Sequence, residues 1–334
     1  MTVVVPVHQA GATLDEALAS VAVQTRPADE VLVALNGCTD ESAEIARRYA
    51  ARDRRIVLLE RPEADLVGAL NDAIEQARGS LLARLDADDV MAPDRLRLQV
   101  EALDRHRDWV GVTSRVRCEA VDGGAPGRGM SRYVDWLNGL TTPEAIAHAR
   151  FIDSPLCQPA VTMRTSALRE AGGYHRGGFA EDHDLWLRLI GAGARFGVVP
   201  EPLLTWRDHP GRLTRADPRF SAARRRALVH RHLVAGPLAR GRRCRVWGAG
   251  RYGKAHARGL RALGVPVDDV IDVDPRKVGR EVAGGVPVVD ARAVGPPDGR
   301  LVLLAVASRG AREVVSARLE ALGHVIGRDF LPVQ

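Results

Sequence analysis

The chain has 334 residues, of which 46% are hydrophobic and 27% charged, an ordinary composition for a globular protein. This length favours two domains. No apolar run approaches the roughly 18 residues that span a bilayer, and the N-terminus has no signal-peptide pattern. The four cysteines are scattered without a CxxC pair, which excludes a disulfide framework or a cysteine zinc site. We therefore expect a protein of the reducing cytoplasm.

The formal net charge is +6, and all but two of the 48 basic residues are arginine. Basic residues crowd the stretch 212–261, where few acidic residues occur. Such a run suits peripheral contact with an anionic membrane surface or binding of a phosphorylated acceptor. A solvated helix and linker would show the same pattern. Nucleic acid is not an expected partner, because there is no recognisable binding module and aromatic residues are few.

The first third of the chain alternates strands with helices. Apolar strands are predicted at 2–7, 30–35, 56–59 and 80–85, with a helix after each. This order is typical of βαβ units, so we predict an α/β fold with a mostly parallel central sheet. Ligands of such sheets bind beyond the carboxyl ends of the strands. The fourth strand ends at the acidic sequence Asp86-Ala-Asp-Asp89.

Further along the chain the pattern weakens and then resumes. The stretch 121–150 is the least patterned and begins with a Gly-rich loop. Strands are predicted at 160–163, 196–199 and 203–206, and helices at 180–190 and 221–238. These elements suggest a first domain over residues 1–215, an arginine-rich helix and linker over 216–241, and a smaller α/β domain over 242–334.

The acidic sequence places three carboxylates within four residues. Like charges this close repel one another unless a cation neutralises them. Oxygen ligands suit Mg²⁺ or Mn²⁺, which also bind diphosphate oxygens. A metal held here would stabilise the charge on a departing diphosphate. An acidic turn that caps the next helix is the alternative explanation of the same pattern.

Five ordered segments together resemble the family 2 glycosyltransferases, which have the GT-A fold. The segments are residues 3–8, 20–25, 29–40, 83–89 and 172–188, so the resemblance covers about residues 1–215. It implies a metal-dependent, inverting enzyme that moves a sugar from a nucleotide diphosphate sugar to an acceptor hydroxyl. The implied acceptor is a glycan or a lipid-linked glycan, in the assembly of a bacterial surface polysaccharide or glycoconjugate.

The resemblance also implies roles for individual residues. Asp88 would be the main metal ligand, and His209 would complete the metal site. Asp182 would be the general base that deprotonates the acceptor hydroxyl, and the neighbouring Glu181 would orient the loop or the sugar. The residues implied in donor or nucleotide binding are Pro6, His8, Asn36, Asp40 and Asp86.

Two positions depart from the family pattern. Leu35-Asn36 stands where a pair of aspartates is usual, one of which faces the nucleobase. An amide still offers a donor and an acceptor to a base edge, but the change calls a uridine donor into question. His8-Gln9 stands where an aromatic residue and asparagine are common. The imidazole of His8 would either stack on a base or pack in the core.

The C-terminal part begins with a strand that leads into Gly248-Ala-Gly250-Arg-Tyr-Gly253, the context of a dinucleotide-binding fingerprint. Asp272 lies 22 residues beyond Gly250, near the place of the ribose-binding acid. This Rossmann-like domain would bind NAD or a nucleotide sugar, or would only stabilise an assembly. Two alternative functions remain open: an NAD-binding oxidoreductase or epimerase, and a non-catalytic nucleotide-sugar-binding scaffold. The oligomeric state is not indicated by the sequence.

Overall fold

The computed structural model describes residues 1–121, 124–306, 308 and 310–333. Within it the chain forms two compact units. The first comprises residues 1–147, 155–177 and 181–217, and the second comprises 148–154, 178–180 and 218–334. The arginine-rich helix α10 (Ala222–Ala235) therefore belongs to the second unit.

The first unit is built on an eight-stranded sheet with the order β3-β2-β1-β4-β7-β6-β8-β5. The first four strands in this order run parallel, and β6 runs parallel to β8. β7 and β5 pair antiparallel with their neighbours. The strands are β1 (Thr2–Val7), β2 (Glu30–Asn36), β3 (Ile56–Arg61), β4 (Leu81–Arg84), β5 (Val90–Met91), β6 (Trp109–Ala120), β7 (Thr162–Arg164) and β8 (Arg195–Asp208).

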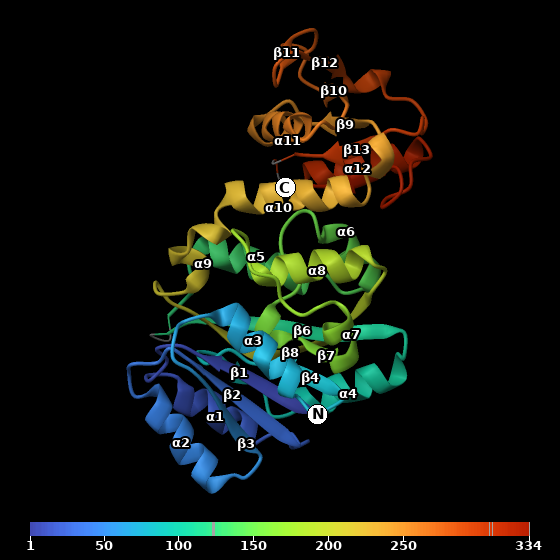
Figure 1. Ribbon diagram of the computed structural model, residues 1–334. Coiled ribbons are helices and arrows are strands. Elements are labelled where there is room, and N and C mark those ends of the chain that lie inside the picture. The colour runs from blue at the N-terminus through green and yellow to red at the C-terminus, as the bar shows by residue number, and fades with distance from the viewer. Residues whose placement is uncertain (122–123, 307, 309, 334) are drawn as a thin grey trace. The chain divides into compact units, whose positions relative to one another are not determined.

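Helices cover both faces of this sheet, which explains why its strands read as continuous apolar runs. Successive side chains of a strand point to opposite faces. In β1, Val3 and Val5 join the core beneath α1 (Leu14–Ala22) and α2 (Ser42–Arg52). Val4 joins the opposite core, with α3 (Leu66–Gln76) and α8 (Glu181–Gly191). Figure 1 shows α1 and α2 on one side of the blue strands and α3 on the other.

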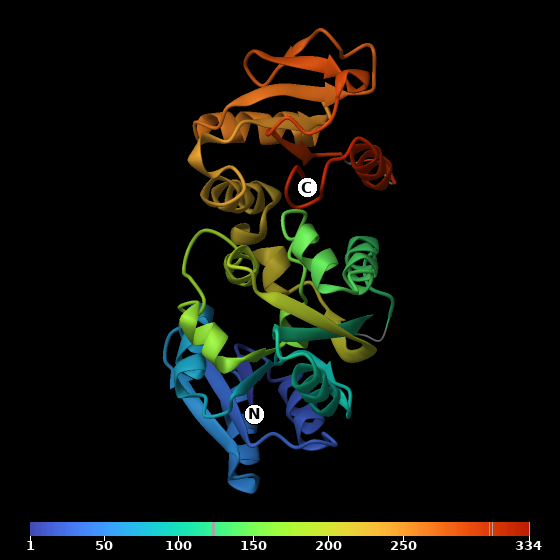
Figure 2. The ribbon, with the colours of Figure 1, turned by 90° about the vertical axis from the view of Figure 1, so that its right-hand side faces the viewer.

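The strands predicted at 196–199 and 203–206 are in fact one long strand, β8, which lies beside β6 (Figure 2). Prolines at 200 and 202 interrupt the sequence pattern, which is why the prediction divided the strand. The register between the two strands shifts at Arg115, where Pro202 lies opposite. Proline cannot donate a ladder hydrogen bond and is tolerated at such irregularities.

The weakly patterned stretch 121–150 contains two helices, α5 (Arg128–Asn138) and α6 (Pro143–Ala149). Residues 122 and 123 of the predicted Gly-rich loop lie outside the described residues. The other α-helices described in this unit are α4 (Arg95–Arg105), α7 (Thr165–Glu170) and α9 (Leu213–Ala216). Across the described residues of both units, every helix is too short or too polar to cross a membrane.

The second unit has a six-stranded sheet with the order β11-β12-β10-β9-β13-β14, parallel except for β11. Its core includes Trp247, Ile271 and Leu304 from the strands and Leu319 from a covering helix. The strands are β9 (Cys244–Trp247), β10 (Val267–Asp272), β11 (Glu281–Val282), β12 (Val286–Asp290), β13 (Leu301–Leu304) and β14 (Phe330–Pro332). Besides α10, the helices are α11 (Arg251–Ala262) and α12 (Ala311–Ala321).

A buried pair of histidines joins α10 to α11 in this unit. Nε2 of His230 lies 2.9 Å from Nδ1 of His256, and both residues are buried. A Cβ atom at Gly259 would come within 2.4 Å of the His230 ring, so glycine is needed for this close packing. Burial, helped by the nearby charge of Arg226, lowers the pKa of His230 to about 4. Protonation of His230 therefore opposes folding of this unit.

We predict that the second unit loses stability between pH 6.5 and pH 4. An unfolded histidine has a pKa of about 6.5, so over this range the unfolded state binds the extra proton. Above pH 6.5 His230 is neutral in both states and does not reduce the free energy of unfolding. As the pH drops to 4, that free energy falls by on the order of 3 kcal/mol. Calorimetry of the full chain should show that the free energy of unfolding depends less steeply on pH in His230→Gln than in the wild type. The exposed His106→Gln is the control, and an unchanged slope in His230→Gln would contradict the prediction.

Candidate active site

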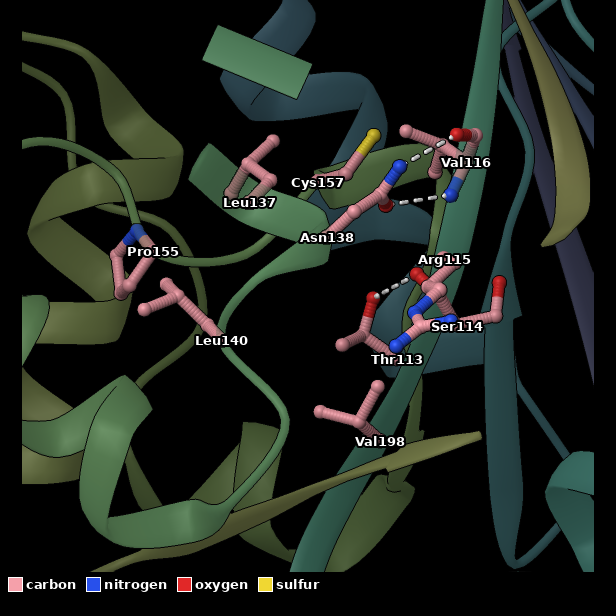
Figure 3. A pocket seen from close by; sticks show the side chains of 10 residues that line it. All are labelled: Thr113, Ser114, Arg115, Val116, Leu137, Asn138, Leu140, Pro155, Cys157 and Val198. Atoms are coloured by element: carbon pink, nitrogen blue, oxygen red, sulfur yellow. Dashed lines mark hydrogen bonds between the residues drawn. The ribbon is translucent and has the colours of Figure 1, made fainter. Parts of the chain in front are cut away.

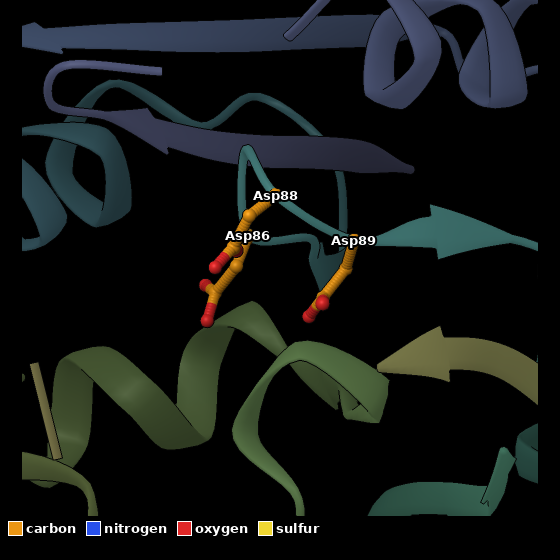
Figure 4. Close-up of side chains that lie close together, drawn as sticks. All are labelled: Asp86, Asp88 and Asp89. Atoms are coloured by element: carbon orange, nitrogen blue, oxygen red, sulfur yellow. The ribbon is translucent and has the colours of Figure 1, made fainter. Parts of the chain in front are cut away.

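The three carboxylates of the acidic turn gather just beyond the carboxyl end of β4. Asp86, Asp88 and Asp89 each offer an oxygen atom, and these atoms all lie within 4.8 Å of one another. Figure 4 shows the Asp86 and Asp88 side chains together, with Asp89 extending toward the same side. The position at a strand end is where the sequence predicted a ligand site.

Asp89 is the most buried member of this acidic cluster. Its Oδ1 accepts a hydrogen bond from the backbone N–H of Arg207 at 2.9 Å. Its Oδ2 is buried and has no hydrogen-bond partner among the described residues. Burial, together with the charges of Asp88 and Asp86, raises the pKa of Asp89 well above its usual range. An unsatisfied buried oxygen beside two further carboxylates fits a divalent cation that prefers oxygen ligands, such as Mg²⁺ or Mn²⁺.

The structure also brings His209 to the acidic cluster, although the two are more than a hundred residues apart in sequence. His209 follows the end of β8, and its Nε2 lies 2.9 Å from Oδ2 of Asp88. The hydrogen bond between Arg207 and Asp89 ties the end of β8 to the acidic turn. Both residues predicted to hold a metal thus lie in contact.

Two buried arginines lie next to the acidic turn, and the sequence analysis did not single them out. Nε of Arg84 donates to Oδ1 of Asp86 at 2.8 Å, and Arg95 donates through Nη2 to the carbonyl oxygen of Arg84 at 2.7 Å. Burial opposes the charge of Arg84, but Asp86 raises its pKa. Burial lowers the pKa of Arg95 to about 10. Arg84 precedes Asp86 by two residues, so the period of a strand is the signal that would have paired them.

The predicted catalytic residues lie in the first turn of α8. Glu181 is buried, and Asp182 is half-buried with its Oδ1 accepting from the backbone N–H of His183 at 2.7 Å. Burial raises the pKa of the Tyr174 phenol, Arg84 opposes this rise, and Glu181 and Asp182 add to it. The start of α8 and the acidic turn therefore share one electrostatic environment.

The residues predicted to contact the donor lie near the carboxyl ends of β1 and β2. His8 is exposed, and its Nδ1 donates to the carbonyl oxygen of Asn36 at 2.7 Å. Oδ1 of Asn36 accepts the backbone N–H of Asp65 at 2.6 Å. A backbone N–H needs an acceptor, so this bond fixes the orientation of the Asn36 amide, whose residue is buried.

The contacts of Pro6 and Asp40 are with the surrounding backbone. Pro6 is buried within β1 and lies opposite Ala34 of β2. Asp40 accepts hydrogen bonds from the backbone N–H groups of Gly11 at 2.7 Å and Ser42 at 3.1 Å. Asp40 therefore holds the loop that follows β1.

The part of the chain that carries these residues matches a known protein family. Residues 2–171, about half of the chain, match the model of Glycosyl transferase family 2. The chain belongs to glycosyl transferase family 2. It is therefore a glycosyltransferase, and the matched segment includes the acidic turn and the ends of β1 and β2.

Relatives of this glycosyltransferase include proteins named for polysaccharide synthesis. The O-antigen biosynthesis glycosyltransferase WbnJ of Escherichia coli is 26% identical over 216 residues, 63% of this chain and 80% of that protein. The amylovoran biosynthesis glycosyltransferase AmsE of Erwinia amylovora is 26% identical over 192 residues, 57% of this chain and 69% of that protein.

Solved structures establish the fold of this family member. Residues 1–349 of S. aureus TarS, in complex with UDP-GlcNAc, align with a TM-score of 0.55 and 16% identity, over 78% of this chain and 70% of that one. The mannosyltransferase PcManGT of Pyrobaculum calidifontis, in complex with GDP-Man and Mn²⁺, aligns with a TM-score of 0.50 and 21% identity, over 70% of this chain and 61% of that one. The predicted GT-A fold is thereby confirmed.

The Gly-rich loop of the second unit links β9 to α11. A Cβ atom at Gly253 would lie 1.7 Å from the carbonyl oxygen of Gly248, so close packing of helix on strand explains this glycine. Gly250 precedes the first turn of α11 and has open space beside it. The Asp272 carboxylate is buried and accepts hydrogen bonds from the N–H of Ala249 at 2.7 Å and from Lys277 at 3.0 Å. These bonds tie the end of β10 to the Gly-rich loop.

Proposed function

We propose that this glycosyltransferase is metal-dependent and inverting, and that it moves a sugar from a nucleotide diphosphate sugar to an acceptor hydroxyl. The observation that carries the proposal is the acidic cluster, in which Asp88 contacts His209 and a buried oxygen of Asp89 has no hydrogen-bond partner among the residues that the structure describes. The relatives named for O-antigen and amylovoran biosynthesis support a role in assembling a bacterial surface glycan. The expected acceptor is accordingly a glycan or a lipid-linked glycan.

Asp88 and His209, together with Asp86 or Asp89, would hold Mg²⁺ or Mn²⁺ at the acidic cluster. The bound cation would supply positive charge to stabilise a departing diphosphate. The PcManGT complex with GDP-Man and Mn²⁺ supports this choice of metal. Arg84 fixes the Asp86 carboxylate through its 2.8 Å hydrogen bond, so Asp86 is oriented before a donor arrives.

In this proposal, Asp182 is the general base. The acceptor oxygen attacks the anomeric carbon while its proton passes to the Asp182 carboxylate, and the bond to the diphosphate oxygen breaks on the opposite face. This in-line displacement inverts the anomeric configuration. Glu181 is buried in the same turn, and its charge adds to the field around Arg84. We assign Glu181 to orienting that turn.

The nucleobase would lie near His8 and Asn36 at the ends of β1 and β2. The exposed imidazole of His8 is held by its bond to the Asn36 carbonyl oxygen, and the Asn36 NH₂ group points away from the Asp65 N–H. The complexes of TarS with UDP-GlcNAc and of PcManGT with GDP-Man support a nucleotide sugar as donor. The identity of the base is the first property to measure.

We predict that one nucleoside diphosphate stabilises the chain only when a divalent metal is present. UDP, GDP, dTDP, CDP and NADH should be tested by thermal unfolding, each with and without Mn²⁺. A ligand at about 100 times its dissociation constant should raise the melting temperature by about 5 °C or more, because it binds only the folded state. The shift should vanish in Asp88→Ala. If only NADH stabilised the chain, and did so equally without Mn²⁺ and in Asp88→Ala, the result would contradict the proposal and favour an oxidoreductase or epimerase.

We also propose that about residues 242–334 of the second unit form a Rossmann-like domain. Five of its strands follow the order β12-β10-β9-β13-β14, which is the order of one doubly wound half-sheet extended by two strands. Asp272 accepts hydrogen bonds from Ala249 and Lys277 through one oxygen, and a carboxylate can accept further bonds. Binding of NAD or a nucleotide sugar, and a role that only stabilises an assembly, both stay predictions for this domain. Cytoplasmic location and peripheral membrane contact through the arginine-rich segment also stay predictions.

A further inference from the structure

The residue proposed as general base, Asp182, follows a turn and a loop that side chains of the first unit hold at their start. The turn comprises residues 171–174, and the loop comprises residues 175–180, directly before α8. The loop contains the consecutive glycines Gly177 and Gly178. Glycine loses more conformational freedom on folding than any other residue, so side-chain contacts are needed to fix the backbone that leads to Asp182.

Asn71 of α3 holds the backbone of the turn. Its Nδ2 donates to the carbonyl oxygen of Tyr174 at 2.9 Å, and its Oδ1 accepts the N–H of the same residue at 2.8 Å. Gly173 has a φ of +68°, and a Cβ atom there would lie 2.5 Å from Oδ1 of Asn71, so the contact requires glycine. Asn138 makes the same paired contact with the backbone of Val116, where Figure 3 shows it between the end of α5 and β6. In both places one asparagine amide joins two elements that are distant in sequence.

Arg188 holds the same turn from the side of α8. Its Nη1 donates to the carbonyl oxygen of Ala171 at 2.6 Å, and its Nη2 donates to that of Gly173 at 2.7 Å. Its Nε donates to the Asp184 carboxylate at 2.8 Å. Asp184 lies in the first turn of α8, as does Asp182. The turn therefore links α3 to the helix start that carries the proposed base.

A bidentate ion pair joins the loop to the residue that caps α3. Nη1 and Nη2 of Arg176 donate to Oδ1 and Oδ2 of Asp65 at 2.6 and 2.5 Å. The Asp65 side chain is only 21% exposed, accepts the N–H of Gly68 at 3.0 Å and also pairs with Arg61. The pair with Arg176 contributes most to lowering the pKa of Asp65. Two parallel hydrogen bonds fix direction as well as distance, so Arg176 holds the start of the loop in one orientation.

Asp65 also contacts the proposed donor site. Its backbone N–H donates to Oδ1 of Asn36 at 2.6 Å, at the end of β2. One residue thus connects the strand end assigned to the nucleobase with the loop that leads to the proposed base. A displacement of about 1 Å from the reactive geometry can cost about a hundredfold in rate, so this connection bears on catalysis.

We propose that Arg176 is a positioning residue for sugar transfer, which acts through Asp65 to place the general base relative to the donor. This inference rests on the proposed function, in which Asp182 is the base and the nucleobase lies near Asn36. Arg176 takes no proton in this role and holds the loop in the conformation from which Asp182 acts. Its side chain is 64% exposed, so the pair adds little to the stability of the whole chain, and Arg176→Gln should fold normally.

Hydrogen exchange and steady-state turnover of the full chain test this role. In Arg176→Gln we expect faster amide exchange in residues 175–182. Turnover is measured as nucleoside diphosphate released from a panel of UDP-, GDP-, dTDP- and CDP-sugars with Mn²⁺. The kcat should fall about tenfold or more, while the donor KM stays within about twofold, because the Asp65 N–H still binds Asn36. Arg176→Lys keeps the charge without the bidentate contact and should recover part of kcat.

Arg47→Gln is the matched control, because Arg47 is an exposed arginine of α2 whose ion pair with Glu60 of β3 lies in the same unit. It should leave exchange and kcat unchanged. Asp65→Asn removes the same ion pair as Arg176→Gln and keeps an oxygen for the N–H of Gly68. The double variant should therefore lose no more kcat than Asp65→Asn alone.

An unchanged kcat in Arg176→Gln would overturn the positioning role, and so would losses that multiply in the double variant. A rise in the donor KM that matches the fall in kcat would also overturn it, because the damage would then lie in the donor site. The exchange measurement needs no donor, so unchanged exchange in residues 175–182 refutes the role of the ion pair by itself. A wild-type chain that releases no nucleoside diphosphate from any donor would instead refute the proposed function, and this inference with it.

Discussion

Replacing Asp88 by asparagine is expected to reduce sugar transfer by about a thousandfold and to remove the Mn²⁺ dependence of donor binding. The substitution keeps the size of the side chain and an oxygen that can accept from His209, which lies 2.9 Å away. It removes the negative charge that would hold a divalent cation. Without that cation the diphosphate is neither held when the donor binds nor stabilised as it leaves, so Mn²⁺-dependent donor binding should be lost together with the rate.

Transfer is measured as nucleoside diphosphate released, first in the absence of an acceptor and then with acceptor glycans. Asp104→Asn is the matched control, because Asp104 is an exposed aspartate on the far end of α4 that pairs only with Arg107 among the described residues. It should leave both rate and metal dependence unchanged. Asp88→Asn with near-normal, Mn²⁺-dependent turnover would remove Asp88 from the metal site and leave the acidic turn as a helix-capping element.

The sequence predicted the first half of the first unit, from β1 to β4, well, because local patterns determine it. β1 and β2 are apolar through their length, and each leads into a helix whose boundary the sequence marks within a few residues. Parallel strands buried on both faces leave a continuous apolar run. For these elements the apolar residues of the sequence are also the residues buried in the structure, so the sequence pattern predicts them directly.

The part of the first unit from β6 to α6 was predicted poorly. β6 went unrecognised, although Val110, Val112 and Val116 are β-branched residues of the kind strands favour. Arginines interrupt that run because the end of β6 is exposed rather than covered. The helices α5 and α6 were also missed, since α5 begins beside a Gly-rich stretch that reads as a loop. These elements are stabilised by contacts far apart in sequence.

The residues of the candidate site also fall into those that a local pattern or the family resemblance predicted and those that it did not. The acidic cluster is visible in four consecutive residues, and resemblance to the family supplied Asp182 and His209. The arginine contacts of the turn and the bond from Asp65 to Asn36 depend on how strands and helices meet, so a local pattern does not show them.

Substitution of Asp182 by asparagine is expected to lower transfer by about 10² to 10⁴ while donor binding stays close to normal. The Asp182 carboxylate lies at the start of α8, where its Oδ1 accepts from the N–H of His183 at 2.7 Å. Asparagine keeps an oxygen acceptor for that bond, so the helix start should remain folded. What it loses is the basicity needed to take the acceptor proton.

The pH profile separates this loss of a base from a structural defect. If Asp182 is the base, the acidic limb of the wild-type rate profile should disappear in Asp182→Asn, and the nucleotide thermal shift should be unaltered. Glu201→Gln, which neutralises an exposed carboxylate on β8, should leave both unchanged. A variant that binds donor normally and still transfers at the wild-type rate would show that another group takes the proton, and the buried Glu181 would be the next residue to substitute.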